Sequence, residues 1–257
     1  MAISDAIKEL NEPVNKLLVP VASSAGKTLQ DIWELVFGGF GAYVEKKRVI
    51  RAKDIEDFKA SLSNKVASIP SDQLIDPPLA IVGPALEASK YYFEEKELRE
   101  LFANLIASSM NSSHSTIVHP SFVEIIKQMS ALDAQNLALF SVENQTLPIA
   151  EIHLETSTSM KILQTNVFLS NPDVQDIDRQ AMSITSLVKL GLLSVSYDKY
   201  LIDETEYRAL DEHAEFLELK AEYPPNNEGK EVAVLSRGSV TLTPLGFAFL
   251  SVCFPDP

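Results

Sequence analysis

The chain has 257 residues, of which 46% are hydrophobic and 23% are charged, a balance that excludes an intrinsically disordered protein. The formal net charge is −14, and it is uneven: residues 1–118 have net charge −3 and residues 119–257 have −11, which argues against binding of nucleic acid by the distal half. A single cysteine excludes an internal disulfide and the first residues lack a signal peptide, so we expect a cytoplasmic protein.

The N-terminal part is predicted to form a helical arm. Pro13 and Pro20 interrupt its first stretches, and helical spacing then runs from about residue 22 toward residue 65. The segment 32–44 is almost wholly apolar, yet it is shorter than the roughly 20 residues that a membrane span needs. The only basic patch follows it, formed by Lys46, Lys47, Arg48, Arg51 and Lys53.

Apolar and aromatic side chains next to cations can also lie in a membrane interface. Candidates for contact with lipid or with a partner are Trp33, Phe37, Lys46, Lys47, Arg48 and Arg51. The competing interpretation, which we favour, is an ordinary core helix with a charged end.

The clearest helix covers residues 94–110. Its apolar residues Leu98, Leu101, Phe102, Leu105 and Ile106 recur every three to four positions, and glutamates occupy the first turn, where the helix dipole favours negative charge. A helix is also predicted before it, at 79–93. Two more should follow, one from Pro120 and one at 131–142.

Beyond Pro148 short β-compatible segments appear. The predicted order is strands at 149–154 and 161–169, a helix at 176–190 ended by Gly191, a strand at 192–201, an acidic helix at 204–223, strands at 232–235 and 240–242, and a last helix at 244–253 capped by Thr243. This order resembles a winged-helix module. We therefore predict a mainly α protein with a smaller α+β part, in which a helical domain at 1–118 precedes a winged-helix-like domain at 119–257.

No pattern of residues predicts catalysis. Gly26-Lys27-Thr28 has Val21 where a phosphate-binding loop needs glycine. The four histidines and Cys253 lack the spacing of a metal site, so neither a metal nor a cofactor is expected. Runs of carboxylates at 94–97 and 204–222 are best explained as solvated helix faces.

Three motifs resemble the Abi-alpha family of abortive-infection proteins. They are ELRELFANL at 97–105, HPSFV at 119–123 and SALDA at 130–134, and the segment before residue 90 is also similar. The family is linked to bacterial resistance to phage. The resemblance therefore implies a bacterial or prophage origin and a role in phage defence, without an established active site.

The motif residues look structural. The set comprises Leu98, Arg99, Phe102, Asn104, Leu105, His119, Pro120, Phe122 and Asp133. The apolar members should pack two helices together, and His119 with Pro120 should fix the junction before the second. Arg99 and Asn104 should make specific hydrogen bonds, with Asp133 as the candidate acceptor.

We expect a non-enzymatic protein that acts in phage defence through contacts with a protein partner from host or phage, with self-association left open. One alternative is a membrane-active effector that uses residues 32–53, with peripheral membrane contact. The other is a regulatory winged-helix module. The helix at 176–190 begins with Asp176 and Asp178 and lacks the surplus of positive charge that docks a DNA duplex.

Overall fold

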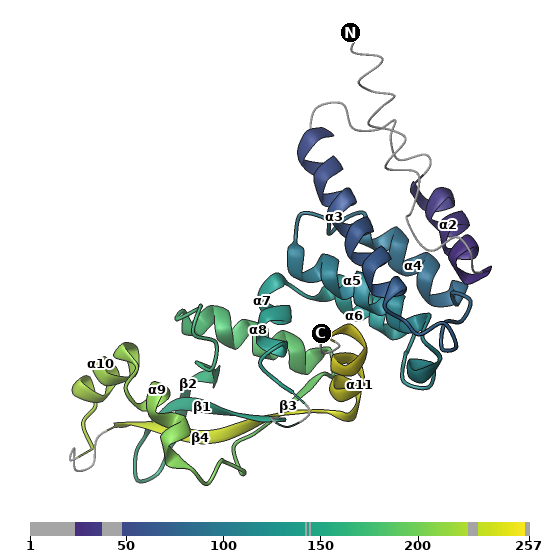
Figure 1. Ribbon diagram of the computed structural model, residues 1–257. Coiled ribbons are helices and arrows are strands. Elements are labelled where there is room, and N and C mark those ends of the chain that lie inside the picture. Colours follow the sequence, from purple (N-terminus) through teal and green to yellow (C-terminus); the bar gives the residue numbers. More distant parts are fainter. Residues whose placement is uncertain (1–23, 38–47, 142, 144, 226–230, 255–257) are drawn as a thin grey trace. The chain divides into compact units, whose positions relative to one another are not determined.

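The computed structural model describes residues 24–37, 48–141, 143, 145–225 and 231–254 (Figure 1). Contacts divide the chain into two compact units, one within residues 1–131 and 248–257 and the other within 132–247. The boundary expected between residues 118 and 119 falls inside the first unit, because the helix after Pro120 contacts the helices before it.

The first unit is helical. Its elements are α2 (Ser24–Phe37), α3 (Arg48–Ala67), α4 (Leu79–Ser89), α5 (Lys96–Ser109), the short η2 (Ser112–His114) and α6 (Ser121–Gln128). The predicted helices at 79–93, 94–110 and after Pro120 thus end close to their expected limits. One long helical stretch toward residue 65 was expected where the structure has α2 and α3; the residues between these two helices lie outside the described part.

Helix α5 is the centre of the first unit, since α3, α4 and α6 all contact it. From Leu98 onward every residue except Glu100 is buried, including polar ones. The sequence predicted an amphipathic helix with one buried stripe. A helix surrounded by neighbours buries both sides, which a single apolar stripe does not reveal.

The second unit combines helices with one antiparallel sheet. Its elements are α7 (Ala131–Leu137), β1 (Thr146–Glu155), β2 (Met160–Val167), α8 (Ile177–Lys189), β3 (Leu193–Ser196), η3 (Glu204–Tyr207), α9 (Arg208–Asp211), α10 (Ala214–Glu222), β4 (Val232–Leu242) and α11 (Pro244–Cys253). The strand order is β2-β1-β4-β3. Helix α11 starts in this unit, and its residues from Ala248 onward belong to the first.

The two faces of β1 have different surroundings. Ala150, Ile152 and Leu154 enter an apolar cluster with Tyr207, Leu210 and Phe216, which come from the segment between β3 and β4. Residues directly opposite in an antiparallel pair share a face, so Leu235 and Ala233 of β4 lie on this same side. The odd-numbered residues of β1 occupy the other face.

Two element predictions were wrong in detail. Strands at 232–235 and 240–242 are one strand, because β4 pairs with β1 without interruption from Val232 to Thr241. The acidic helix at 204–223 is three short helices. The break lies at His213, whose backbone is extended (φ −65°, ψ 134°) before α10.

A closely packed junction joins α8 to α11. Gly191 ends α8 at φ +76°, a left-handed conformation that glycine adopts readily. The Thr243 hydroxyl accepts a hydrogen bond from the Gly246 N–H at 2.9 Å, so Thr243 caps α11 as predicted. A β-carbon on Gly246 would lie 2.0 Å from the Leu192 carbonyl oxygen, which explains why glycine stands there.

The molecule is therefore mainly helical with a four-stranded antiparallel sheet. The finer prediction of a winged helix is not confirmed, because β3 and β4 are separated by the long helical segment η3–α10 rather than joined by a short wing. Within the described ranges, no helix is both long enough and apolar enough to cross a membrane.

Candidate functional site

The apolar residues of the motifs lie in the core of the first unit. Leu98, Phe102 and Leu105 of α5 and Phe122 of α6 have no exposed surface. The Phe122 ring meets the Phe249 ring edge-on, with centroids 5.2 Å apart. These side chains therefore hold helices together and leave no surface for a ligand.

Arg99 connects α5 to α3. Its Nη1 lies 3.2 Å from the Asp54 Oδ1, and it also donates to the Phe93 carbonyl at 3.1 Å. The Asp57 carboxylate lies at 3.9 Å from Nη2. Since the Arg99 side chain is buried, this ion pair fixes the packing of two helices rather than presenting a charge to solvent.

Asn104 and Ser108 bind the end of α11. The Asn104 amide donates to the Cys253 carbonyl at 2.7 Å, and the Ser108 hydroxyl donates to the Val252 carbonyl at 2.9 Å. The last carbonyls of a helix have no partner inside it, so these two side chains, one turn apart on α5, satisfy them. The partners of Arg99 and Asn104 thus differ from Asp133, the acceptor that we expected.

His119 stabilises the start of α6. Its exposed ring accepts the Ser121 N–H at Nδ1 over 3.1 Å and contacts the Ser121 hydroxyl at 2.7 Å. Pro120 stands immediately before the helix. Both residues thus set the junction, as their order in the sequence suggested.

The aromatic candidates for lipid contact are buried. The rings of Trp33 and Phe37 are tilted against each other with centroids 4.3 Å apart, and Phe58 and Phe93 complete the cluster. Lys46 and Lys47 lie outside the described residues. Arg48 and Arg51 belong to α3, but their side chains also lie outside the described part.

A buried polar network lies between α7 and α8, and the sequence did not reveal it. Asn136 donates to Gln180 at 2.8 Å and to Ser183 at 3.0 Å, while Asn171 donates to Asn136 at 2.8 Å. Asp133, the last motif residue, accepts from Ser186 of α8 at 3.1 Å. The signal was present in α8, where Gln180 and Ser183 interrupt the apolar stripe, whereas Val188, expected on that stripe, is 37% exposed.

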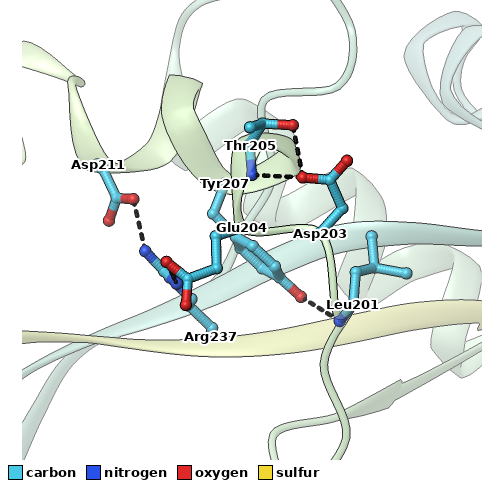
Figure 2. A network of polar contacts seen from close by, with 7 residues as sticks. All are labelled: Leu201, Asp203, Glu204, Thr205, Tyr207, Asp211 and Arg237. Atoms are coloured by element: carbon cyan, nitrogen blue, oxygen red, sulfur yellow. Dashed lines mark hydrogen bonds and ion pairs between the residues drawn. The ribbon is translucent and has the colours of Figure 1, made fainter.

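A second polar network stands on β4, as Figure 2 shows. The buried Tyr207 hydroxyl accepts from the Leu201 N–H at 2.9 Å and donates to the Gly238 carbonyl at 2.7 Å. The Arg237 guanidinium lies 5.2 Å from the centre of the Tyr207 ring and binds Asp211 at 2.9 Å. These contacts fasten η3 and α9 to the sheet.

The pKa values of Arg237 and Asp203 in this network are shifted by neighbouring side chains and backbone groups. Burial alone would lower the pKa of Arg237, but the hydrogen bond and charge of Asp211, with Glu204 further away, raise that pKa above its usual value. The Thr205 hydroxyl and N–H donate to Asp203 at 2.7 and 2.9 Å and hold the pKa of that carboxyl below its usual range (Figure 2). Such contacts are typical of a structural turn.

The described residues contain no group of three His, Cys, Asp or Glu side chains that could hold a metal ion. Their large exposed apolar side chains are of more interest, because several lie in the acidic second unit. Met182 on α8 is 69% exposed, and Tyr200 and Ile202, which follow β3, are 66% and 96% exposed. We therefore take these three side chains as the candidate binding residues of the second unit.

Comparison with known proteins decides the family. The family model described as abortive infection alpha matches residues 50–253. The chain belongs to this family. Within the abortive infection alpha family match lie the central helix α5, both polar networks and the whole sheet, whereas α2 lies outside it.

Other comparisons add little to the family assignment. No curated protein matches the chain. One solved structure with similarity is an uncharacterized protein from the hydrocarbon-degrading marine bacterium Alcanivorax borkumensis SK2, at 16% sequence identity and a TM-score of 0.34, covering 55% of this chain and 94% of that chain. Similarity at this level does not establish a common fold.

Proposed function

We propose that this member of the abortive infection alpha family acts in phage defence by binding a protein partner through the surface of its second unit, without a chemical step of its own. Membership of the family supports the role in defence. The observation that carries the mode of action is the presence of large apolar side chains on a strongly acidic surface.

The charge of the second unit favours a partner with basic groups. Residues 132–247 contain 18 Asp and Glu against 8 Lys and Arg, a net charge of −10. Charge of one sign on a surface accelerates encounter with a surface of the opposite sign, and apolar side chains then supply affinity as they leave water. Fully burying one such side chain contributes about 1.5–3 kcal/mol.

The exposed face of α8 also fits a protein better than a DNA duplex. Met182 and Val188 are exposed on this helix, and Asp178 lies one turn before Met182, whereas a DNA-reading helix presents polar groups to base edges. The exposed cations Arg179 and Lys189 are balanced by Asp176 and Asp178, so the helix offers phosphates no surplus of positive charge. The proposal therefore leaves out the regulatory DNA-binding alternative.

A membrane-active role has no such support. Trp33 and Phe37, which would enter the lipid interface, fill the core of the first unit. These two side chains could reach lipid only if the helices of the first unit separated.

Site-specific photocrosslinking during infection tests the proposal. A photoreactive amino acid replaces Met182 or Ile202 in the second unit, and Leu79 or Tyr91, which are also exposed, in the first. We expect one crosslinked protein from the second-unit positions after infection and none from the control positions. Identical products from all four positions, or none from Met182 and Ile202, would contradict the proposal.

A further inference from the structure

One face of α8 carries four exposed side chains in a single stripe. This α8 stripe consists of Asp178, Met182, Thr185 and Lys189. The successive spacings of four, three and four residues align such positions along one face of an α-helix. Since the opposite face of α8 is buried, the stripe points away from the core of the second unit.

Neighbouring elements hold α8 in place beside the stripe. The Ser186 hydroxyl donates a hydrogen bond to Asp133 of α7 at 3.1 Å. The Asn166 amide of β2 donates to the Thr185 hydroxyl at 2.9 Å. Between these contacts and the solvent, Met182 is 69% exposed. The helix therefore presents the stripe on a backbone that is fixed from both α7 and β2.

The two charges of the stripe lie at its opposite ends. Asp178 is in the first turn of α8 and Lys189 is in the last, about 16 Å further along the helix axis. No residue of opposite charge lies three or four positions from either of them, where an ion pair within the helix would form. Both charges are thus available to a surface that meets the whole stripe.

The stripe is complementary to itself when one copy is reversed. Its spacing reads the same in both directions, so two antiparallel copies of α8 place Asp178 of each copy opposite Lys189 of the other. Met182 of each copy then faces Thr185 of the other. Antiparallel helices also bring opposite ends of their dipoles together, which is favourable. Each contact occurs twice, as in an interface with two-fold symmetry.

From this pattern we infer that two copies of the chain associate through their α8 stripes in antiparallel orientation; the inference goes beyond the proposed function and does not depend on it. The two Met182 side chains leave water at the centre of the interface and supply affinity. The two pairs of Asp178 with Lys189 close its ends. Ion pairs at a surface are individually weak, so they fix the antiparallel alignment more than they add affinity.

The acidic character of the second unit limits this association without preventing it. Its net charge of −10 repels a second copy, but at about 0.15 M salt charges more than about 8 Å apart are largely screened. Charges in direct contact at the ends of the stripe keep more of their attraction. One pair of helices is also smaller than the roughly 1,200–2,000 Å² interfaces of stable complexes. We therefore expect a weak dimer, populated at about 0.1–1 mM protein.

Sedimentation of the full chain at increasing concentration tests the inference by exchange of charges. The wild type should shift from monomer to dimer. Asp178→Lys places two ammonium groups opposite each other and Lys189→Asp places two carboxylates opposite each other, so each variant alone should stay monomeric. An equimolar mixture of the two variants should form the dimer again, because every facing pair then has opposite charges.

A control variant and a second measurement make the test specific. Glu218→Lys is the same change of charge on an exposed position of α10 and should dimerise like the wild type. Melting temperatures verify the fold of each variant, since both α8 substitutions oppose the helix dipole. Independently of these variants, a photoreactive amino acid in place of Met182 should crosslink the purified chain to α8 of a second copy.

Four results would overturn the inference. They are a wild type that stays monomeric at about 1 mM, a dimer that persists in either α8 variant alone, a mixture of folded variants that stays monomeric, and a Met182 crosslink that is absent or maps outside α8. A crosslink between copies has twice the mass of the chain, which distinguishes it from a crosslinked partner. If the dimer forms but no partner is crosslinked during infection, the inference stands and the proposed function fails.

Discussion

Asn136 of α7 donates a hydrogen bond of 2.8 Å to Gln180 of α8, and neither side chain has any exposed surface. Asn136 makes two further bonds, with Ser183 and Asn171, so both amide N–H groups and the amide oxygen have partners. A satisfied polar network inside an apolar core restricts the helices to one alignment.

Asn136→Ala should destabilise the protein by about 2–4 kcal/mol, because Gln180, Ser183 and Asn171 each lose a partner in a place that water does not reach. Chemical denaturation measures this change. Gln175→Ala removes an exposed amide that bonds the Pro172 carbonyl and should change the free energy of unfolding by less than about 0.5 kcal/mol. Equal effects of both substitutions would show that the network does not stabilise the fold.

Tyr207→Phe removes one oxygen atom from the network on β4. It leaves the Leu201 N–H and the Gly238 carbonyl without their partner, so we expect a loss of about 1–3 kcal/mol in the free energy of unfolding. Tyr200 is 66% exposed, and Tyr200→Phe is the matched control with an expected change near zero. A stable Tyr207→Phe variant would mean that water replaces the hydroxyl.

Two glycines should respond to alanine to very different degrees. Gly246→Ala places a β-carbon 2.0 Å from the Leu192 carbonyl oxygen, a backbone atom that cannot move aside alone, so a loss of at least about 3 kcal/mol is expected. Gly83 lies inside α4, and apart from its chain neighbours nothing lies within 4 Å of its β-carbon position. Because the ring of the following Pro84 crowds a β-carbon there, the helical preference of alanine is offset, and Gly83→Ala should change the free energy of unfolding by less than about 1 kcal/mol. Melting temperatures of the two variants test the pair, and equal drops for both would contradict it.

Cys253 should make stability fall in alkali. Burial raises the pKa of its thiol well above the usual value, so the thiolate forms only in the unfolded chain. Below the unfolded pKa of about 8.5 both states hold the proton, and above it the unfolded state is favoured. By pH 9.5 the free energy of unfolding should fall by about 1 kcal/mol more than in Cys253→Ala. Parallel pH profiles of the two proteins would show that the thiol ionises in the folded state.

The regular elements were largely predictable from local patterns. The spacing of Leu98, Phe102 and Leu105 predicted α5, and Gly191 marked the end of α8, because periodicity and helix termini are properties of neighbouring residues. The single strand β4 was not predictable as one element. Its central residues are not β-like by composition, and the ladder with β1, distant in sequence, holds them.

The polar contacts were less predictable than the elements. The side chain of Asn104 was singled out from the sequence, yet its acceptor lies 149 residues away on α11, and no local pattern connects them. The burial of polar residues on β1 was not predicted for the same reason. Glu151, His153 and Glu155 look like an ordinary exposed face of a strand until the burial of the first two is known.

The number of plaques that phage form on bacteria producing the protein is the most direct test of the claim that the second unit binds a partner in phage defence. Plaque counts are compared for cells that produce the wild type, the pair Met182→Lys and Ile202→Lys, or the control pair Leu79→Lys and Tyr91→Lys, all four positions being exposed. We predict protection with the wild type and the control pair, and loss of protection with the second-unit pair at unchanged melting temperature. Full protection with the second-unit pair would contradict the claim.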